Sequence, residues 1–256
     1  MGKNQNSNRR IKTVKNASEI LETVRISDGI SLSELTVNHD LSKTTIYNHL
    51  KTLEELQYIH KKKDKYYIGL GFVKLGECAL QSIDLPDFAE PEALDLAEEI
   101  NGRVEVMVEQ GGKGYCVYQY TANDGVTTNI DIGDEILFYC TAMGKAYLSA
   151  LPQDEAETIV EGITLEPMTE NTITSREELY NELEMSKKRG YSINDEERVF
   201  GMRAIGAPIV TQQDSILGSI SVSLPVTRMD DDLVESRIPT LVRKTASVIA
   251  VKEMYD

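Results

Sequence analysis

Apolar and polar residues alternate with a helical period between residues 42 and 56. Four apolar residues share one arc of a helix with about 3.6 residues per turn, and four polar residues share the opposite arc. The apolar set is Ile46, Leu50, Leu53 and Leu56, and the polar set is Thr44, Asn48, Lys51 and Glu55. This pattern predicts a helix with one packed face and one face that is free to contact another molecule.

Two further helical patterns precede this segment. Residues 14–27 predict a first helix that ends before Gly29, and Ser31 or Ser33 is placed to cap a short second helix. The hydroxyl of Ser42 is placed to cap the third helix in the same way. Together the three patterns predict a tri-helical unit with a turn before its last helix.

A hairpin pattern follows the third helix. Residues 58–60 and 66–70 predict two short strands, and the basic run Lys61-Lys62-Lys63-Asp64-Lys65 lies between them. In a winged helix-turn-helix, one helix enters the major groove and a basic hairpin contacts the adjacent backbone. We therefore predict DNA binding, although a short helical bundle with surface lysines is also compatible with a protein-interaction module.

The rest of the chain predicts two more helices and then a mixture of strands and helices. Residues 72–83 form the pattern of a linker helix that stops before Pro86, and residues 90–101 form an amphipathic helix. Strands are predicted at residues 104–108, 115–120, 126–132, 203–211 and 216–224, and helices at residues 143–151, 153–160, 176–189 and 233–255. Short turns between neighbouring strands indicate an α+β fold with a mainly antiparallel sheet.

These patterns divide the 256 residues into four parts. Residues 1–10 are predicted to be a disordered basic arm, and residues 11–70 a winged helix-turn-helix DNA-binding domain. Residues 71–85 are assigned to the linker helix, and residues 86–256 to a ligand-binding α+β domain. A two-domain organisation fits the chain length.

Charge is distributed unevenly between these parts. The net charge of -15 by itself disfavours a nucleic-acid partner. Residues 1–70, however, carry 12 Lys or Arg and 8 Asp or Glu, a net charge of +4. The remaining residues carry 15 and 34, a net charge of -19. This separation is compatible with a DNA-binding head on an acidic body.

The cysteines and the N-terminus indicate an intracellular protein. Cys78, Cys116 and Cys140 are far apart and lack CxxC spacing, so neither a disulfide framework nor a zinc site is predicted. The N-terminus has no apolar signal segment, and no stretch approaches the roughly 18 apolar residues of a membrane span. We expect a cytoplasmic protein with no cofactor, no metal and no membrane partner.

Candidate DNA contacts lie on the free face of the third predicted helix and in the basic hairpin. Thr44, Thr45 and Asn48 are candidate base readers, because Asn pairs with adenine and the Thr methyl contacts thymine. The competing interpretation is that Thr45 and Tyr47 contact only phosphate, and that the hairpin lysines form a solvated turn. The complete predicted set is Ser42, Lys43, Thr44, Thr45, Tyr47, Asn48, Lys51, Lys61, Lys62, Lys63 and Lys65.

No catalytic motif is complete in the C-terminal part. Gly144-Lys145 suggests a phosphate-binding loop, but Tyr139 occupies the position of the required glycine. The carboxylates at residues 195–197 are interpreted as surface or capping groups rather than as a general acid or base. All three histidines precede residue 61, so the body has none for a catalytic triad or a zinc site. We therefore predict no catalytic residues.

A ligand site is predicted instead on a late strand. Ser221 and Ser223 alternate with apolar residues, so one face of this strand carries hydroxyls. Together with Asp195 and the backbone N–H groups of the helix start at residues 141–144, they would suit a small polar ligand such as a carboxylate, a hydroxylated acid or a sugar. The competing interpretation is that both serines face solvent.

Several motifs together resemble the IclR family of transcriptional regulators. The N-terminal motifs are Leu32-Ser33-Glu34-Leu35, Lys43-Thr44-Thr45-Ile46 and Tyr67-Ile68-Gly69-Leu70-Gly71. The C-terminal motifs are Thr141-Ala142-Met143-Gly144-Lys145-Ala146, residues 190–197, residues 201–208 and Ile220-Ser221-Val222-Ser223. Each motif alone is weak, but their order and spacing cover nearly the whole chain.

The resemblance implies a winged helix-turn-helix, a linker helix and a GAF-like effector domain in a homodimer or homotetramer. It also implies a double-stranded DNA operator and a small-molecule metabolite effector as partners. The effector positions that carry over are Ala142, Met143, Asp195, Pro208, Ser221 and Ser223. The chain departs from the family at Asn48 and His49, where Arg-Leu is usual, and at Leu224, where a small residue is usual.

We therefore expect a sequence-specific transcriptional regulator that is not an enzyme and whose operator binding or activation is controlled by a metabolite. Two other functions compete with this interpretation. One is a nucleoid-type structural DNA binder without an effector response. The other is a metabolite-acting enzyme with an accessory DNA-binding head.

Overall fold

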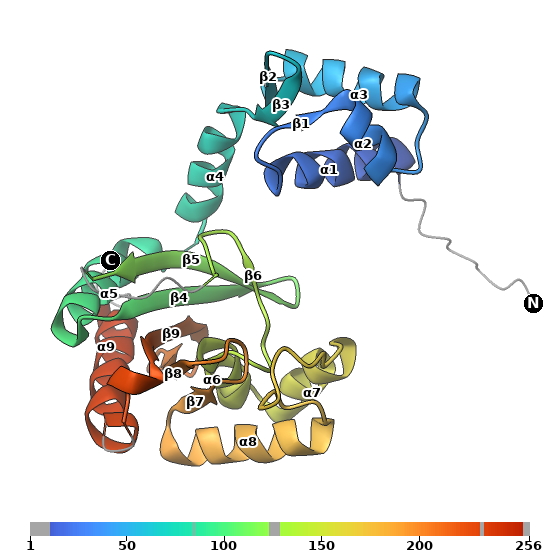
Figure 1. Ribbon diagram of the computed structural model, residues 1–256. Coiled ribbons are helices and arrows are strands. Elements are labelled where there is room, and N and C mark those ends of the chain that lie inside the picture. Colours follow the sequence, from blue (N-terminus) through green and yellow to red (C-terminus); the bar gives the residue numbers. More distant parts are fainter. Residues whose placement is uncertain (1–10, 84, 123–128, 231–232, 253–256) are drawn as a thin grey trace, which may run out of the picture. The chain divides into compact units, whose positions relative to one another are not determined.

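The computed structural model describes residues 11–83, 85–122, 129–230 and 233–252 (Figure 1). The chain divides between Ser82 and Ile83 into two compact units, and each unit has an apolar core of its own. The predicted linker helix, which forms at Gly71–Gln81 as α4, belongs to the first unit. The predicted basic arm at residues 1–10 lies outside the described residues.

The first unit contains the predicted three helices and hairpin, and a short strand that was not predicted, β1, extends the hairpin to a three-stranded sheet. Its elements are α1 (Lys12–Arg25), β1 (Ile30–Ser31), α2 (Leu32–Asn38), α3 (Lys43–Glu55), β2 (Ile59–Lys62) and β3 (Lys65–Ile68). The strands pair antiparallel in the order β1-β3-β2. One apolar core holds the unit together, formed by Ile20, Val24, Ile30, Leu35, Ile46, Leu50, Leu53, Ile59 and Tyr66.

Serine caps fix where the second and third helices begin. Ser31 caps α2 in a reciprocal capping box with Glu34, and the Oγ of Ser42 accepts a hydrogen bond from the backbone N–H of Thr45 at 3.1 Å. Leu56 differs from the prediction, because α3 ends at Glu55 and the Leu56 side chain is 54% exposed rather than packed.

The second unit is built on a six-stranded antiparallel sheet. The strands are β4 (Arg103–Gln110), β5 (Lys113–Thr121), β6 (Glu135–Ile136), β7 (Ser192–Asp195), β8 (Met202–Val210) and β9 (Ile216–Pro225), in the order β6-β5-β4-β9-β8-β7. The α-helices are α5 (Pro86–Ile100), α6 (Ala142–Ala150), α7 (Gln153–Gly162), α8 (Arg176–Arg189) and α9 (Ile238–Lys252). Two short helical segments, η1 (Val226–Arg228) and η2 (Leu233–Arg237), precede α9.

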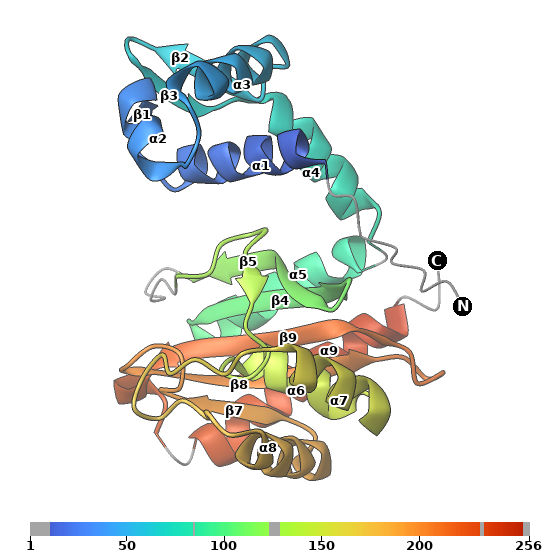
Figure 2. The ribbon, with the colours of Figure 1, turned by 90° about the vertical axis from the view of Figure 1, so that its right-hand side faces the viewer.

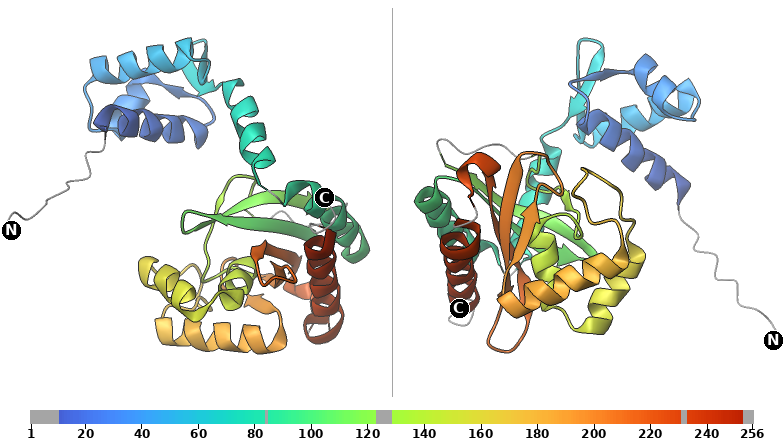
Figure 3. Two further views of the ribbon diagram at one scale, coloured as in Figure 1. Left: turned by 180° about the vertical axis from the view of Figure 1, so that it is seen from behind. Right: turned by 60° about the horizontal axis from the view of Figure 1, so that its bottom comes forward.

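Helices cover both faces of this sheet. Helices α5 and α9 pack together against one face (Figure 2), and α6 and α8 lie on the other (Figure 3). Successive residues of a strand point to opposite faces. Along β9, the hydroxyl of Ser219 therefore reaches the Met143 carbonyl of α6, while Leu224 approaches Gly102 at the end of α5. The α6-facing side of the sheet is the one that carries the serines.

Two predicted elements differ from the structure. Residues 129–132 of the predicted strand 126–132 do not form a strand, and residues 123–128 lie outside the described part of the chain. A turn at Asp131–Asp134 stands where the end of that strand was predicted. Gly133 has a positive φ of 90° in this turn, and its amide donates to the Cys116 carbonyl at 2.7 Å. Helix α5 begins at Pro86 rather than at residue 90, because proline is well tolerated in a first helical turn.

The first turn of α6 lies directly on β8. A Cβ atom at Gly206 would lie 2.5 Å from the backbone oxygen of Ala142, which is closer than any real Cβ contact. Only glycine at residue 206 permits this approach without moving the helix.

Within the described ranges, no helix is long and apolar enough to cross a membrane.

Gly206→Ala should lower the free energy of unfolding by about 1–3 kcal/mol, because the added methyl group meets backbone rather than a movable side chain. Urea denaturation measures this loss. Gly162→Ala is the matched control, since nothing lies within 4 Å of a Cβ at residue 162. Equal stability of the two variants would contradict the close packing of α6 on β8.

Candidate functional site

The exposed face of α3 carries most of the predicted DNA contacts. Residues 43, 44, 47, 48 and 51 are exposed, and the buried residues of the helix lie on its other side. Ser42 and Thr45 differ from the rest, because their hydroxyls bond each other at 2.8 Å and the Ser42 Oγ caps the helix. In the free protein these two side chains fix the start of α3, while Asn48 projects from its exposed face.

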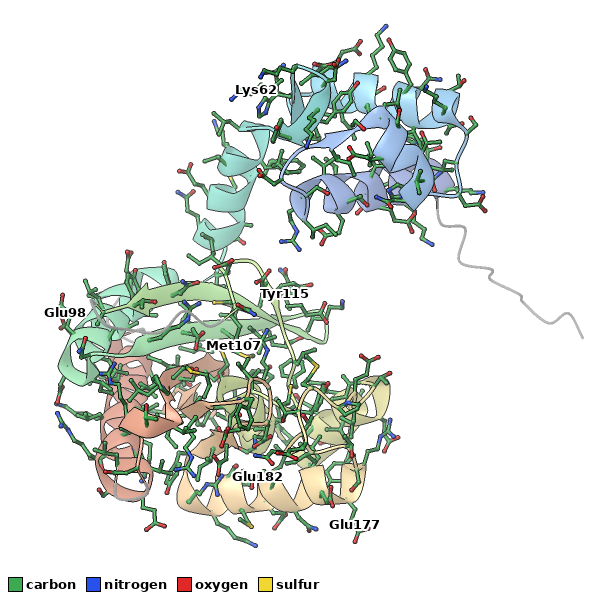
Figure 4. The ribbon with its side chains drawn as sticks, viewed as in Figure 1. Lys62, Glu98, Met107, Tyr115, Glu177 and Glu182 are labelled. Atoms are coloured by element: carbon green, nitrogen blue, oxygen red, sulfur yellow. The ribbon has the colours of Figure 1, made fainter. Side chains whose placement is uncertain are left out.

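The hairpin formed by β2 and β3 carries the predicted basic residues. Lys61, Lys62, Lys63 and Lys65 are all exposed, and Lys62 pairs directly with Lys65 across the hairpin. Figure 4 labels Lys62 on this hairpin. Lys63 occupies the turn with a positive φ of 56°. Four exposed ammonium groups on one tight hairpin suit contact with a phosphate backbone.

The second unit contains a small cavity between α6 and the polar side of the sheet. Its volume is about 30 Å³. The lining residues are Glu105, Ile130, Thr141, Ala142, Met143, Asn194, Arg198, Val199, Met202, Arg203, Ala204, Ser221 and Ser223. A cavity of this size holds only a few atoms, because one water needs about 10–15 Å³ on the same measure.

Strand register explains why polar side chains gather here. Ser221 pairs with Glu105 of β4 on one side and with Gly206 of β8 on the other, and Gly206 pairs in turn with Ser192 of β7. Directly paired residues point to the same face of a sheet. These four paired residues therefore form a row across the sheet on the side that faces α6. The row holds one carboxylate and two hydroxyls, and its glycine lies where the helix touches the sheet.

The start of α6 forms one wall of the cavity. Thr141 caps the helix, and its Oγ1 accepts from the Gly144 amide at 3.1 Å. The carbonyls of Ala142 and Met143 accept hydrogen bonds from Ser192 and Ser219, which holds the turn on the sheet. The first amides of a helix have no acceptor within the helix, and its dipole is positive at this end. This wall is therefore suited to an anion.

Two arginines lie in the lining of the cavity. Arg203 donates to Asp195 at 2.6 Å and to the Met229 carbonyl at 3.2 Å, so its position is well defined. Arg198 donates to the Asn129 carbonyl at 3.4 Å. Glu105 is the one acidic residue among the lining residues. Asp195 offsets the charge of Arg203, so the start of α6 and Arg198 are the features that favour an anionic ligand.

A buried ion pair ties α6 to the turn that carries Arg198. Lys145 of α6 is completely buried and donates to the Oε1 of Glu197. Burial raises the pKa of the Glu197 carboxyl, and Lys145 opposes this shift. The Glu197 amide in turn donates to the Oδ1 of Asn194 at 2.9 Å, which links the pair to a cavity residue.

Four of the six predicted effector residues meet at the cavity: Ala142, Met143, Ser221 and Ser223. The serines are 1% and 7% exposed, so the interpretation that they face solvent is wrong. Two predicted residues lie outside the lining set. Asp195 is exposed and holds Arg203 instead of lining the cavity. Pro208 lies two residues beyond Gly206 on β8, where it pairs with Ser219.

Sequence reasoning missed Glu105, Asn194, Arg198 and Arg203. A signal for Glu105 was present, because Arg103 and Glu105 alternate with Val104 and Val106 in a strand that is otherwise apolar. Charged residues at every second position of a central strand indicate a polar face. The two arginines gave no comparable signal, since β7, β8 and the turn between them bring them to the cavity.

Known proteins are similar to this chain over nearly its full length. The family model described as bacterial transcriptional regulator IclR C-terminal matches residues 77–251. A Halobacterium salinarum protein named "Probable HTH-type transcriptional regulator ArcR" is 31% identical over 253 residues, covering 97% of this chain and 96% of that protein. The Escherichia coli HTH-type transcriptional regulator KdgR is 25% identical over 248 residues, covering 96% of this chain and 94% of that protein.

A solved structure agrees with these sequence matches. The crystal structure of the Thermotoga maritima IclR superposes with a TM-score of 0.79 at 26% identity, covering 95% of this chain and 99% of the other. The resemblance predicted from the sequence motifs and the predicted α+β fold class are thereby confirmed. The chain belongs to the IclR family of transcriptional regulators.

Proposed function

We propose that the protein regulates transcription by binding a palindromic operator as a dimer, under the control of a small anionic metabolite in the second unit. The observation that carries this proposal is the cavity where the start of α6 meets buried hydroxyls and the guanidinium group of Arg198. A ligand that binds one arrangement of the dimer better than another shifts the population toward it. The spacing of the two DNA-binding heads then changes with ligand.

The first unit supports the DNA-binding part of the proposal. Helix α3 presents short polar side chains on its exposed face, and the lysine hairpin follows it in the chain. In this arrangement Asn48 reads a base edge, and the lysines position the head on phosphates. The positive charge of residues 1–70 offsets the repulsion between DNA and the acidic remainder.

Helix α4 supports a second copy of the chain as a partner. It has no buried residue although it is largely apolar, and Val73 and Leu75 are 55% and 51% exposed. At the start of α1, the N-cap residue Ile11 and Val14 are also exposed, at 70% and 64%. Exposed apolar surface of this kind marks an interface, and a symmetric dimer is the commonest way to cover it.

Asn48→Ala and the triple change Lys61→Ala, Lys62→Ala, Lys63→Ala should affect DNA binding differently. The triple variant should weaken binding to operator and random DNA alike, and each lost phosphate contact should reduce the salt slope of log K by about 0.9. Asn48→Ala should cost about 1–3 kcal/mol on operator DNA only. Fluorescence anisotropy against salt concentration measures both, with two chains expected per operator.

Lys187→Ala with Lys188→Ala, on α8 of the second unit, is the control for lost positive charge and should leave the salt slope unchanged. Equal losses on operator and random DNA for Asn48→Ala would contradict its role as a base reader. An unchanged slope in the triple variant would remove the hairpin from the DNA interface.

Ser221→Ala with Ser223→Ala should shift the ligand response to higher ligand concentration while leaving operator affinity without ligand intact. Each lost hydrogen bond is worth about 1 kcal/mol, so ligand affinity should fall at least about tenfold. The readout is operator affinity with and without small carboxylates, first selected by their stabilisation of the wild-type protein in thermal unfolding. Ser247→Ala, exposed on α9, is the control; an unaltered response in the double variant would exclude the serines from the site.

A further inference from the structure

A groove lies between strand β6, at the edge of the sheet, and helix α7, both labelled in Figure 1. It is lined on the sheet side by residues 111–113 and 135–139, and on the helix side by residues 158–159 and 162–164. Its volume is about 470 Å³, and among the described residues it shares none with the lining of the cavity at α6. Pockets that hold small molecules span about 300–1,000 Å³. The size of the groove therefore suits a small molecule.

The floor of the groove is apolar. Phe138 is 3% exposed and belongs to the core of the unit, where its ring stacks on Tyr147. Leu137, Ile159 and Ile163 pack on the same core but stay half-buried, which leaves part of each side chain open to the groove. Apolar side chains held by a core on one side and open on the other are the usual lining of a ligand pocket. Covering them with an apolar molecule is favourable because it removes their surface from water.

Gly162 keeps the helix side of the groove open. It is the last residue of α7, its φ is not positive, and no atom of the described residues lies within 4 Å of a Cβ at this position. Neither the backbone nor the neighbouring residues therefore require glycine here, although glycine lowers helix stability relative to alanine. A glycine of this kind is accounted for if the space beside it holds another molecule.

The charged groups of the groove are paired with each other. Lys113 and Glu135 are the two charged residues of the described lining, and the Nζ of Lys113 donates to the Oε2 of Glu135 at 2.6 Å. Both side chains are exposed, so the pair lies at the rim. A charged ligand would lose its hydration without gaining a free partner of opposite charge. The groove is therefore complementary in charge to an uncharged molecule.

The edge of β6 offers one hydrogen-bond donor and one acceptor. Cys116 of β5 exchanges backbone hydrogen bonds with the bulge at residues 133–134. Such exchange recurs at every second residue of an antiparallel pair, so the next exchanging pair is Gly114 with Ile136. Glu135 lies between these pairs and therefore points its backbone N–H and carbonyl to the free edge of the sheet. Because Glu135 lines the groove, an amide group of a ligand can bond to both.

A peptide strand added to this edge is the alternative occupant. Strand β6, however, has only two residues, Glu135–Ile136. Very short edge strands are one way in which sheets avoid the addition of further strands. The edge offers the backbone pairing of one residue, which suits the amide group of a small molecule better than it suits a peptide.

We propose that this groove is a second small-molecule site, and that it takes an uncharged molecule with an apolar ring body and one amide-like group. The ring body covers Leu137, Ile159 and Ile163, and the amide-like group bonds to the backbone of Glu135. Residues 138–141 lead from the groove directly into the start of α6, so the bound molecule rests on the segment that positions this helix. The site does not depend on the proposed function, because its lining is separate from that of the cavity.

2-Naphthamide tests the assignment on the full-length protein, with 2-naphthoate and 2-naphthamidine as its anionic and cationic counterparts. Two-dimensional NMR of the ¹⁵N-labelled protein follows the backbone amides of Gly112, Glu135 and Gly162 during each titration. 2-Naphthamide should shift them saturably, with a dissociation constant on the order of 0.1–1 mM for a molecule of this size. The charged counterparts should bind at least about tenfold more weakly, because a charge buried without a partner is costly.

Gly162→Leu fills the groove from the helix side. The variant should fold, because the space around a Cβ at residue 162 is open, and 2-naphthamide should bind it at least about tenfold more weakly than the wild type. Glu157→Leu adds the same side chain at an exposed position of α7 outside the groove. This control should stay within about twofold of the wild-type affinity. Thermal unfolding shows whether each variant is folded, and should Gly162→Leu not fold, the three wild-type titrations decide the assignment.

Several results would overturn the inference. If 2-naphthamide leaves the amides of Gly112, Glu135 and Gly162 unmoved, the groove is not a site for this class of molecule. Equal affinity for either charged counterpart would contradict an uncharged ligand, and unchanged affinity in Gly162→Leu would place the molecule elsewhere. Each of these results leaves the proposed anion site at α6 standing. Failure of small carboxylates to bind at α6 would likewise leave the assignment of the groove standing.

Discussion

The contact between the first turn of α6 and strand β8 is the constraint on which the second unit depends. The Ala142 carbonyl occupies the space that a side chain at residue 206 would need. Hydrogen bonds from Ser192, Asn194 and Ser219 to carbonyls at the start of α6 hold this position from the sheet. Because the N-terminus of α6 packs directly on the sheet, the positive end of the helix dipole faces the serines of β9 and not solvent.

A polar sheet face under a buried helix is costly unless each charge has a partner. Lys145 and Glu197 form one such pair, and Arg103 and Glu105 form another. Burial also raises the pKa of the Cys140 thiol to about 11, which keeps this residue beside the network uncharged at neutral pH. With the deep charges balanced in pairs and Arg203 balanced by Asp195, the field at the cavity is set by the helix start and by Arg198. Local rules for a core are broken at this face, as is usual at functional sites.

Elements governed by local sequence were predictable. The period of α3 gave its buried residues Ile46, Leu50 and Leu53, and the capping role of Ser42 followed from its position before a helical pattern. The serines of β9 were recognisable because hydroxyls replaced methyl groups on one strand face. These inferences need only the spacing of neighbouring residues.

The residues beside the serines on the neighbouring strands were not predictable in the same way. Glu105 and Ser221 are far apart in the sequence, and they meet only because β4 and β9 pair in one particular register. A shift of one residue would turn every side chain to the other face. The same reason explains Asp195, which lies at the end of β7, pairs with Arg203 and bonds this lining arginine without lining the cavity itself.

The backbone amides of Ala142 and Met143 offer the most direct test of a ligand-controlled regulator. Their resonances in the ¹⁵N-labelled protein can be followed while a small carboxylate that releases or strengthens operator binding is titrated. The account predicts saturable shifts of both amides, with the same midpoint as the change in operator affinity. Operator binding that responds to the acid while both amides stay unmoved would contradict it.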